Sequence, residues 1–337
     1  MNDQCSLMNA VRGAAGARLV LAALMLVAAG STAAQASAFP TKPVRMIVGF
    51  APGGGTDLAS RLVANALGEA WGTNVIVDNR PGGAGVVGTE LTAKAYPDGH
   101  TLMLCNIGSN AITPARHKNL PFDALKDIAY VSMIGGTPNV FMASNAFPAR
   151  TLGEFIAYAK ANPGKVSFGS SGVGASPHLS IELMKSMVQI DIIHVPYKGA
   201  APALADTMGG QIPVSVGNLP GGPIAAIKAG RVRALGVTTP KRSPQLPDVP
   251  AFAETIPGYE VTGWYGICTQ SAVPKPILAK INGDLNRLLR AGELQRKLAD
   301  QGIDVAPSTQ EEFRAYVVAE IAKWTKVVQQ AGLTGDQ

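Results

Sequence analysis

The sequence predicts an α/β fold of two domains, each a mainly parallel sheet flanked by helices. Apolar, strand-like runs alternate with helical patterns along most of the chain, which is typical of parallel sheets. Two glycine-rich loops, 50–57 and 168–178, each follow a strand and open a helix. Their wide separation suggests one loop in each domain, and 337 residues are enough for about two domains.

The alternation gives the elements in order. Strands are expected at 44–50, 75–78, 102–105, 130–134, 140–143, 166–169, 192–195, 214–216 and 234–238. Helical patterns fall between most of them, at 58–67, 86–95, 152–161, 179–187, 203–208 and 224–229. After residue 266 three helices are expected, whose apolar residues repeat at helical spacing and predict packing against a core: 277–289, 294–298 and 313–328.

Three helix starts carry explicit patterns. Residues 151–154 (TLGE) and 309–312 (TQEE) are capping boxes, in which side chains satisfy the first N–H groups of a helix. Ser176 followed by Pro177 predicts an N-cap and a first helical residue.

The first 36 residues are predicted to be a cleaved signal peptide. Arg12 and Arg18 precede an apolar run at 19–29, and small-x-small cleavage sites end at Ala36 and Ala38. The run is short for a membrane span, so a retained anchor is the weaker alternative. The sequence therefore predicts export from the cytoplasm.

Charge and cysteine content exclude several classes. The formal charge of +6 is spread along the chain, and its densest basic stretch, 231–242, lacks interleaved aromatic residues, so nucleic-acid binding is not expected. Cys105 and Cys268 show no metal-ligand spacing and sit in apolar runs. We expect buried free thiols, with a disulfide as the alternative, and neither a metal nor a cofactor.

The loop at 50–57 (FAPGGGTD) predicts an anion cradle. Glycines let the backbone approach a ligand, and the helix start behind them offers unpaired N–H groups and a partial positive charge. Asp57 would repel an anion, so we assign it to capping of the loop amides. The ligand-binding residues expected here are Phe50, Pro52, Gly53, Gly54, Gly55 and Thr56.

The loop at 168–178 is expected to oppose the first. In open α/β sheets ligands bind beyond the carboxyl ends of the strands, so two facing domains would trap a ligand between two helix N-termini. Hydroxyl and amide donors are expected from Ser170, Ser171, Gly172, Gly174 and Ser176, with His178 beside them.

Two other readings of the glycine motifs are weaker. Gly83 to Gly88 forms a G-x-G-x-x-G pattern, but the acidic residue expected about 20 positions later is missing, so a tight turn lining the cleft is preferred to a dinucleotide site. A secreted serine hydrolase could use Ser171 or Ser170 with His178 or His194. However, Val173 stands where the G-x-S-x-G motif needs its last glycine.

Several segments together resemble the Bug-type periplasmic receptors of tripartite tricarboxylate transporters. They occur in family order across essentially the whole mature chain: 50–57 with Arg61, 77–82 (VDNRPG), 98–102 (DGHTL), 169–172 (GSSG), 194–199 (HVPYKG), Arg242 with 246–250 (LPDVP), and 264–266 (WYG).

The resemblance implies a two-domain periplasmic-binding-protein fold of the Venus-flytrap type II class. Domain 1 would comprise 39–140 plus 263–337, and domain 2 would comprise 141–262. It also implies a monomeric, non-enzymatic periplasmic receptor that delivers a small carboxylate to membrane permease subunits: a di- or tricarboxylate, an acidic amino acid or an aromatic acid. Loop amides, hydroxyls and waters would hold the ligand.

The expected site includes residues beyond the two glycine loops. The expected ligand-binding set also includes Ser109, whose hydroxyl can donate a hydrogen bond, and Tyr197 from the 194–199 segment. Expected beside the site as structural or capping residues are Asp57, Asn79, Gly83 and His178. Lys198 would pair with a ligand carboxylate or lie exposed. Cys105 and Asn106 stand where small hydroxyl residues are expected, which bears on the side-chain end of the ligand.

Overall fold

The computed structural model describes residues 39–117, 119–290 and 292–330. The expected signal peptide and its cleavage sites lie outside these residues. Within them, no helix is both long and apolar enough to cross a membrane. Most expected strands and helices are present and begin and end within a few residues of their expected bounds. The expectation of separate strands at 130–134 and 140–143 is wrong, since both lie in one continuous strand.

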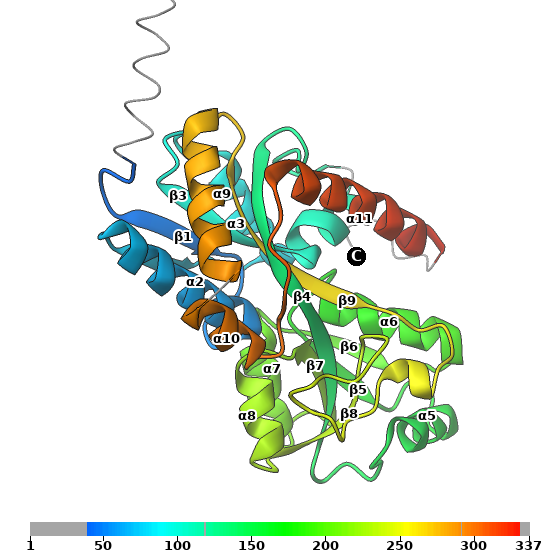
Figure 1. Cartoon of the computed structure of the whole chain (residues 1–337). Helices are drawn as coiled ribbons and strands as arrows, with labels where there is room; N and C mark the ends of the chain where they lie inside the picture. The colour runs from blue at the N-terminus through cyan, green and yellow to red at the C-terminus, as the bar shows by residue number, and fades with distance from the viewer. Residues whose placement is uncertain (1–38, 118, 291, 331–337) are drawn as a thin grey trace, which may run out of the picture.

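Two sheets share one long strand, β4 (Ile128–Ser144). Sheet A contains the first part of β4 with β1 (Val44–Val48), β2 (Val75–Asn79), β3 (Thr101–Asn106), β9 (Thr262–Gln270) and β10 (Asp304–Val305). Sheet B contains the last part of β4 with β5 (Ser167–Ser170), β6 (Ile193–Pro196), β7 (Val214–Asn218) and β8 (Val232–Val237). Figure 1 shows β4 running from the upper half of the molecule into the lower half.

Both sheets are mixed rather than mainly parallel. The expected parallel order holds for β2-β1-β3 in sheet A and for β6-β5-β7 in sheet B. Strand β4 pairs antiparallel with β9 in sheet A, and with β7 and β8 in sheet B. The change of sheet falls between Pro138, paired with Thr262, and Asn139, paired with Asn218. The expected domain boundaries, at 140/141 and 262/263, remain a prediction.

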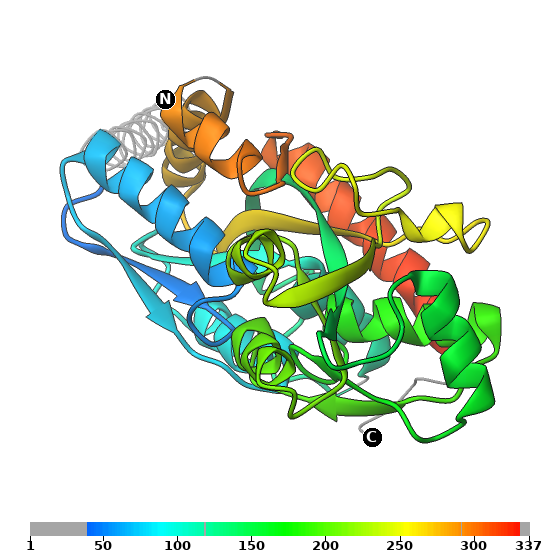
Figure 2. The same ribbon diagram turned by 90° about the horizontal axis from the view of Figure 1, so that it is seen from below.

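Helices cover both sheets, and their apolar sides form the core. Figure 2 shows the blue and cyan segments on one side of the molecule and the green segments on the other. Around sheet A lie α2 (Gly55–Trp71), α3 (Val86–Ala93), α4 (Thr113–Arg116), α9 (Lys275–Arg290), α10 (Glu293–Ala299) and α11 (Gln310–Gln330). Around sheet B lie α5 (Leu152–Ala161), α6 (Ser176–Val188), α7 (Ala200–Met208) and α8 (Gly222–Lys228).

The capping box predicted at 309–312 is present, and the predicted Ser176 cap is wrong. The box predicted at 151–154 forms in part, because Glu154 Oε2 accepts the N–H of Arg150 instead of that of Thr151. Thr151 Oγ1 accepts the N–H of Glu154 at 3.1 Å. At α11 the box is reciprocal, with bonds of 2.9 and 3.2 Å within residues 309–312. Helix α6 begins at Ser176 itself, after Ala175. The Ser176 hydroxyl instead accepts a hydrogen bond from Asn139 Nδ2 at 3.0 Å, which ties the helix start to β4.

The expectation of buried free thiols is confirmed. Cys105 and Cys268 lie on the neighbouring strands β3 and β9, and both are fully buried and unbonded. Burial raises the pKa of the Cys105 thiol, and the adjacent Cys268 adds to the effect. A buried thiol of this kind is unreactive because the thiolate is the nucleophile.

A buried carboxylate fastens α11 to the shared strands. Glu320 Oε2 accepts the indole N–H of Trp264 at 3.3 Å and that of Trp324 at 3.2 Å. Trp264 lies on β9 opposite Gly136 of β4, next to the change of sheet. Glu320 thus links the C-terminal helix to the strands that join the two halves.

Replacing Glu320 by leucine should lower the free energy of unfolding by about 2–3 kcal/mol, because two buried indole N–H groups would lose their acceptor. Urea denaturation measures the change. Glu311→Leu, an exposed position on the same helix, is the control and should shift stability by less than about 0.5 kcal/mol. Equal stability of the two variants would contradict the fastening role of Glu320.

Candidate functional site

The first glycine loop is closed by Asp57. Gly54 is the N-cap of α2 and has no side chain that could accept a hydrogen bond. Asp57, in the first turn, is the side-chain acceptor at this helix start. Its Oδ2 accepts the N–H of Gly53 and Nε of Arg61, each at 3.0 Å. Its Oδ1 accepts Asn79 Nδ2 at 3.0 Å, and the same amide donates to the carbonyl of Phe50.

The buried Asp57 carboxylate therefore has hydrogen-bond donors for both of its oxygens and a cation, Arg61, beside it. Burial raises its pKa, but the hydrogen bonds from Arg61, Gly53 and Asn79 outweigh burial and hold the pKa below its ordinary value. Asp57 remains ionised at neutral pH. It accepts the N–H of Gly53, which is then not available to an anionic ligand.

Close backbone packing fixes the turn at 82–85. A Cβ on Gly49 would lie 2.8 Å from Gly85 Cα, and a Cβ on Gly85 would lie 2.6 Å from Ser109 Cβ. Gly85 also has a φ of 101°, which favours glycine. The G-x-G-x-x-G pattern thus serves close packing between the loops that follow β1, β2 and β3.

Ser109 belongs to a buried polar cluster. It sits in a π-helical turn, Gly108–Ile112, and is fully buried. Its hydroxyl donates to Asn110 Oδ1 at 2.6 Å, and its N–H donates to Asn106 Oδ1 at 3.1 Å. In this structure, therefore, neighbouring side chains already use the polar atoms of Ser109.

The second loop follows β5 and is hydrogen-bonded to itself. Ser170 Oγ bonds the N–H and the C=O of Gly172, each at 3.2 Å. A Cβ on Gly174 would overlap Nη1 of the buried Arg116, so this position admits only glycine.

Tyr197, at the end of β6, donates its hydroxyl to Asp206 at 2.6 Å. Partial burial and this bond raise the pKa of Tyr197 to about 12. The bond turns the hydroxyl toward α7 and fixes the orientation of the ring.

A cavity of about 250 Å³ lies between the loops of the two halves. Among its lining residues, all in the described part of the chain, Lys198 alone carries a formal charge. The wall is made by Gly49, Phe50, Gly82, Gly83 and Ala84 from the sheet A side, and by Ser171, Gly172, Val173, Pro196, Tyr197 and Lys198 from the sheet B side.

The structure brings only some of the expected site residues to this wall. Phe50, Gly83, Ser171, Gly172 and Tyr197 line the cavity. The others do not line it. Pro52 and Gly53 are exposed, and the following residues are buried: Gly54, Gly55, Thr56, Ser109, Ser170, Gly174, Ser176 and His178. Asn79 and Asp57 hold the first loop, as described above.

The two halves touch directly at these loops. The N–H of Ala51 donates to the carbonyl of Lys198 at 3.0 Å. A Cβ on Gly199 would lie 3.1 Å from Ala51 Cβ, so only glycine lets the chains approach this closely. Phe50, Ala84 and Ala175 form a small apolar cluster across the same contact.

The helix start that meets the first loop is that of α7, rather than that of α6 as expected. A Cβ on Gly54 would lie 3.9 Å from the backbone nitrogen of Ala200, the first residue of α7. The N-terminus of α6 packs instead on the π-helical turn, where a Cβ on Gly108 would lie 3.4 Å from Ser176 N. The positive ends of α2 and α7 therefore converge.

Two stacked histidines lie behind the second loop. The rings of His178 and His194 are 3.8 Å apart and 21° from parallel. His194 Nε2 lies 2.6 Å from Ser170 Oγ, and His178 Nδ1 accepts the N–H of Gly174 at 3.0 Å. Burial lowers the pKa of His178 to about 2 and the pKa of His194 to about 4. The nearby His194 contributes to the lowering for His178, and the cations Arg116 and Lys185 contribute to the lowering for both rings.

The Ser170–His194 pair has the wrong environment for a nucleophile and its base. Ser170 is fully buried, and the carboxylate of Glu182 contacts His178, at 3.6 Å, rather than His194. A base with a pKa near 4 also takes up a proton poorly at neutral pH.

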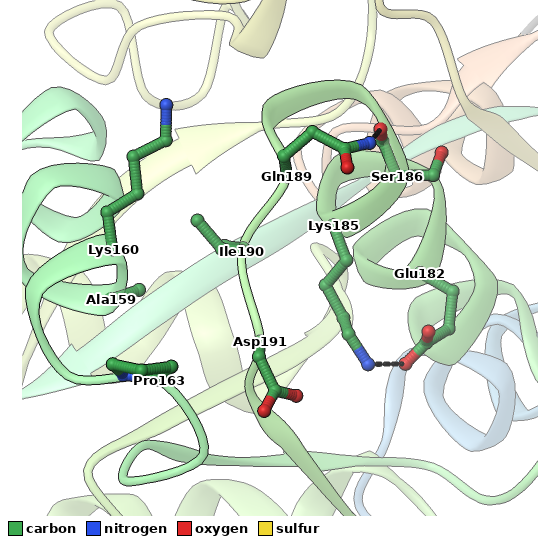
Figure 3. Close-up of a pocket in the computed structure, with 9 residues that line it drawn as sticks. All are labelled: Ala159, Lys160, Pro163, Glu182, Lys185, Ser186, Gln189, Ile190 and Asp191. Atoms are coloured by element: carbon green, nitrogen blue, oxygen red, sulfur yellow. Dashed lines mark hydrogen bonds and ion pairs between the residues drawn. The ribbon is translucent and has the colours of Figure 1, made fainter.

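A second cavity, of about 490 Å³, is a groove between α5 and α6 on the outer side of sheet B. Figure 3 shows Glu182 and Lys185 paired there, at 2.9 Å. It shares no lining residue with the cavity between the glycine loops. In the described residues no group of three His, Cys, Asp or Glu could hold a metal ion.

Comparison with known proteins gives consistent matches over most of the chain. Residues 59–333 match the family described as the tripartite tricarboxylate transporter family receptor. BugT of Bordetella pertussis is 33% identical over 319 residues, covering 94% of this chain and 98% of that protein. A solved structure described as a periplasmic transporter has a TM-score of 0.85 and 36% identity, covering 88% of this chain and 100% of that one.

Two matching structures carry a named acid. A Rhodopseudomonas palustris protein with adipate has a TM-score of 0.84 and 33% identity, covering 87% of this chain and 98% of that one. MatC from the same species, with bound malate, has a TM-score of 0.80 and 29% identity, covering 86% and 100%.

Two α/β halves joined by shared strands, with glycine loops facing one another, define a solute-binding protein of the periplasmic binding-protein class. The matching structures have this fold. The chain belongs to the tripartite tricarboxylate transporter receptor family, as its motifs implied. This family consists of non-enzymatic receptors, so the serine hydrolase alternative is wrong.

Sequence reasoning missed the residues that join the two halves. The contact between Ala51 and Lys198 uses main-chain atoms, which leave no side-chain pattern. Asn218 Nδ2 donates to Asn139 Oδ1 at 2.9 Å beside the change of sheet, and neither asparagine lies in a recognisable motif. The sequence feature that could have indicated the contact is Gly199, a glycine between a strand and a helix where another chain segment can approach closely.

The histidine pair makes stability dependent on pH. Both rings stay neutral in the fold, whereas the unfolded chain binds their protons below about pH 6.5. The unfolded state therefore binds more protons as the pH falls, and the free energy of unfolding should drop by about 2 kcal/mol per histidine between pH 7 and pH 5.

Urea denaturation at the two pH values measures this drop. A double variant, His178→Asn with His194→Gln, cannot titrate at these positions and should lose most of the pH dependence. The same drop in the double variant would show that other groups cause it.

Proposed function

We propose that this receptor captures a small carboxylate in the cavity between the glycine loops and delivers it to the membrane subunits of a tripartite transporter. The cavity carries the proposal: it lies where loops of both halves meet, and its walls combine apolar surface with hydroxyl and backbone groups. The adipate and malate bound to relatives are acids of suitable size.

Electrostatics support an anionic ligand. The N-termini of α2 and α7 converge on the first loop, and each helix end offers about 0.3–1 kcal/mol to an anion, more when it is partly buried. Lys198 stands at the cavity as an exposed cation. The Arg61 guanidinium pairs with Asp57 and does not line the cavity.

Closure of the two halves would complete the site. The Ala51–Lys198 bond and the Phe50, Ala84 and Ala175 cluster join loops on opposite sides of the cavity. A ligand that contacts both sides binds this closed arrangement better than an open one and so shifts the population toward it. The closed form is then the state presented to the transporter.

The family and the expected signal peptide support a periplasmic location. The membrane subunits of the transporter are the proposed partners, and a monomer is the proposed state. The ligand-binding residues proposed from this geometry are Phe50, Gly83, Ser171, Gly172 and Tyr197, supported by the loop around Gly53–Thr56.

A panel of carboxylates should contain a stabilising ligand. At a hundred times its Kd, a ligand that binds only the folded state stabilises it by about 2.7 kcal/mol, which appears as a rise in Tm. Thermal-shift measurements at pH 7 and low salt would compare adipate, malate, citrate, glutamate and benzoate with the corresponding amides. No shift with any of these acids would argue against a carboxylate receptor.

Replacing Gly199 by alanine should weaken binding about tenfold, because the new Cβ would press on Ala51 and oppose closure. Isothermal titration with the best acid of the panel gives the Kd, and small-angle scattering reports the average opening. Gly283→Ala is the control, since a Cβ there meets nothing within 4 Å. An unchanged Kd and unchanged scattering in Gly199→Ala would exclude this contact from closure.

A further inference from the structure

Within the second glycine loop, the segment Ser170–Gly174 is held at both ends by histidines that do not line the cavity. At its start, Ser170 Oγ lies 2.6 Å from His194 Nε2 and also bonds the backbone of Gly172. At its end, the N–H of Gly174 donates to His178 Nδ1 at 3.0 Å. Between these anchors lie Ser171 and Gly172, which form part of the cavity wall.

The two anchors are in contact. The imidazoles stack at 3.8 Å, and Phe168 lies 5.0 Å from His194, so neither ring can turn without displacing its neighbours. Such close packing transmits small displacements, because the interior has little free space. The start and the end of the loop are therefore positioned together.

Hydrogen bonding also fixes the protonation state of His178. A backbone N–H can only donate, so Nδ1 of His178 must be the acceptor, and its proton lies on Nε2. Nε2 faces Glu182 Oε1 at 3.6 Å, and Lys185 Nζ bonds the same oxygen. Figure 3 shows this Glu182–Lys185 pair in the groove between α5 and α6. Arg116 flanks the loop on its other side, at Gly174.

We propose that His178 and His194 are positioning residues, which set the conformation of Ser170–Gly174 and thereby the affinity of the cavity for its ligand. The inference rests on the proposed carboxylate site for its effect on binding. Its effect on the loop needs no ligand, so the two parts are tested separately.

Paired variants at each histidine separate hydrogen bonding from packing. His194→Phe and His178→Phe keep a ring in the stack but lose the polar atom. His194→Gln and His178→Asn place an amide where Nε2 or Nδ1 lies and should restore the bond. Ser170→Ala removes the loop side of one bond without disturbing the rings, which keeps the test informative if a phenylalanine variant fails to fold.

The first measurement is amide hydrogen exchange in the ligand-free chain. Exchange at Gly174 should be about tenfold faster in His178→Phe, and exchange at Gly172 about tenfold faster in His194→Phe and Ser170→Ala. The Gln and Asn variants should return to within about threefold of the wild type. His100→Phe, which alters a buried histidine near sheet A, should leave both glycines unchanged. Unchanged exchange in the Phe and Ala variants would overturn the inference.

The second measurement is the Kd for adipate by isothermal titration, with malate as a second probe. The Phe and Ala variants should bind about tenfold more weakly, and the Gln and Asn variants nearly as well as the wild type. Faster exchange with unaltered Kd would also overturn the inference. If the wild type binds neither acid nor any other in the carboxylate panel, the proposed function fails, whereas the exchange data still decide the role of the histidines.

Discussion

The pairing of β4 with β9, β7 and β8 is the constraint on which the rest of this structure depends. One strand of 17 residues serves first in sheet A and then in sheet B, so the two sheets are connected through a shared strand. Pro138 stands at the change of sheet, where its missing N–H removes a ladder bond. This connection places the two halves so that their glycine loops face one another.

Charge is distributed so that the cavity wall stays nearly neutral. Asp57 is buried, but Arg61 and Asn79 match its charge, and Asp78 is held between Arg45 and Arg80. Paired charges exert little net field on their surroundings, which leaves Lys198, the helix ends and the backbone amides as the attraction for an anion. Such donors tolerate different anions, since they hold a carboxylate without matching a fixed charge geometry.

The sequence predicted the local structure well, because glycine loops, capping boxes and apolar periodicity are local properties. The α5 bounds agree residue for residue, and the capping box of α11 forms as expected. What it could not predict depends on residues distant in the chain. Ser176, for example, is tied to Asn139 of β4 instead of capping its helix. The stacking of His178 on His194 likewise arises only when β6 and α6 meet.

The bond between Ala51 and Lys198 joins main-chain atoms, so substitution of either side chain leaves its donor and acceptor in place. The side chains that face the cavity, such as Phe50, Ser171 and Tyr197, are not part of this bond. Point mutations can therefore change which solute is preferred while the contact between the halves is kept. A scaffold built in this way can diversify after gene duplication into receptors for different solutes while the same main-chain contact joins its halves.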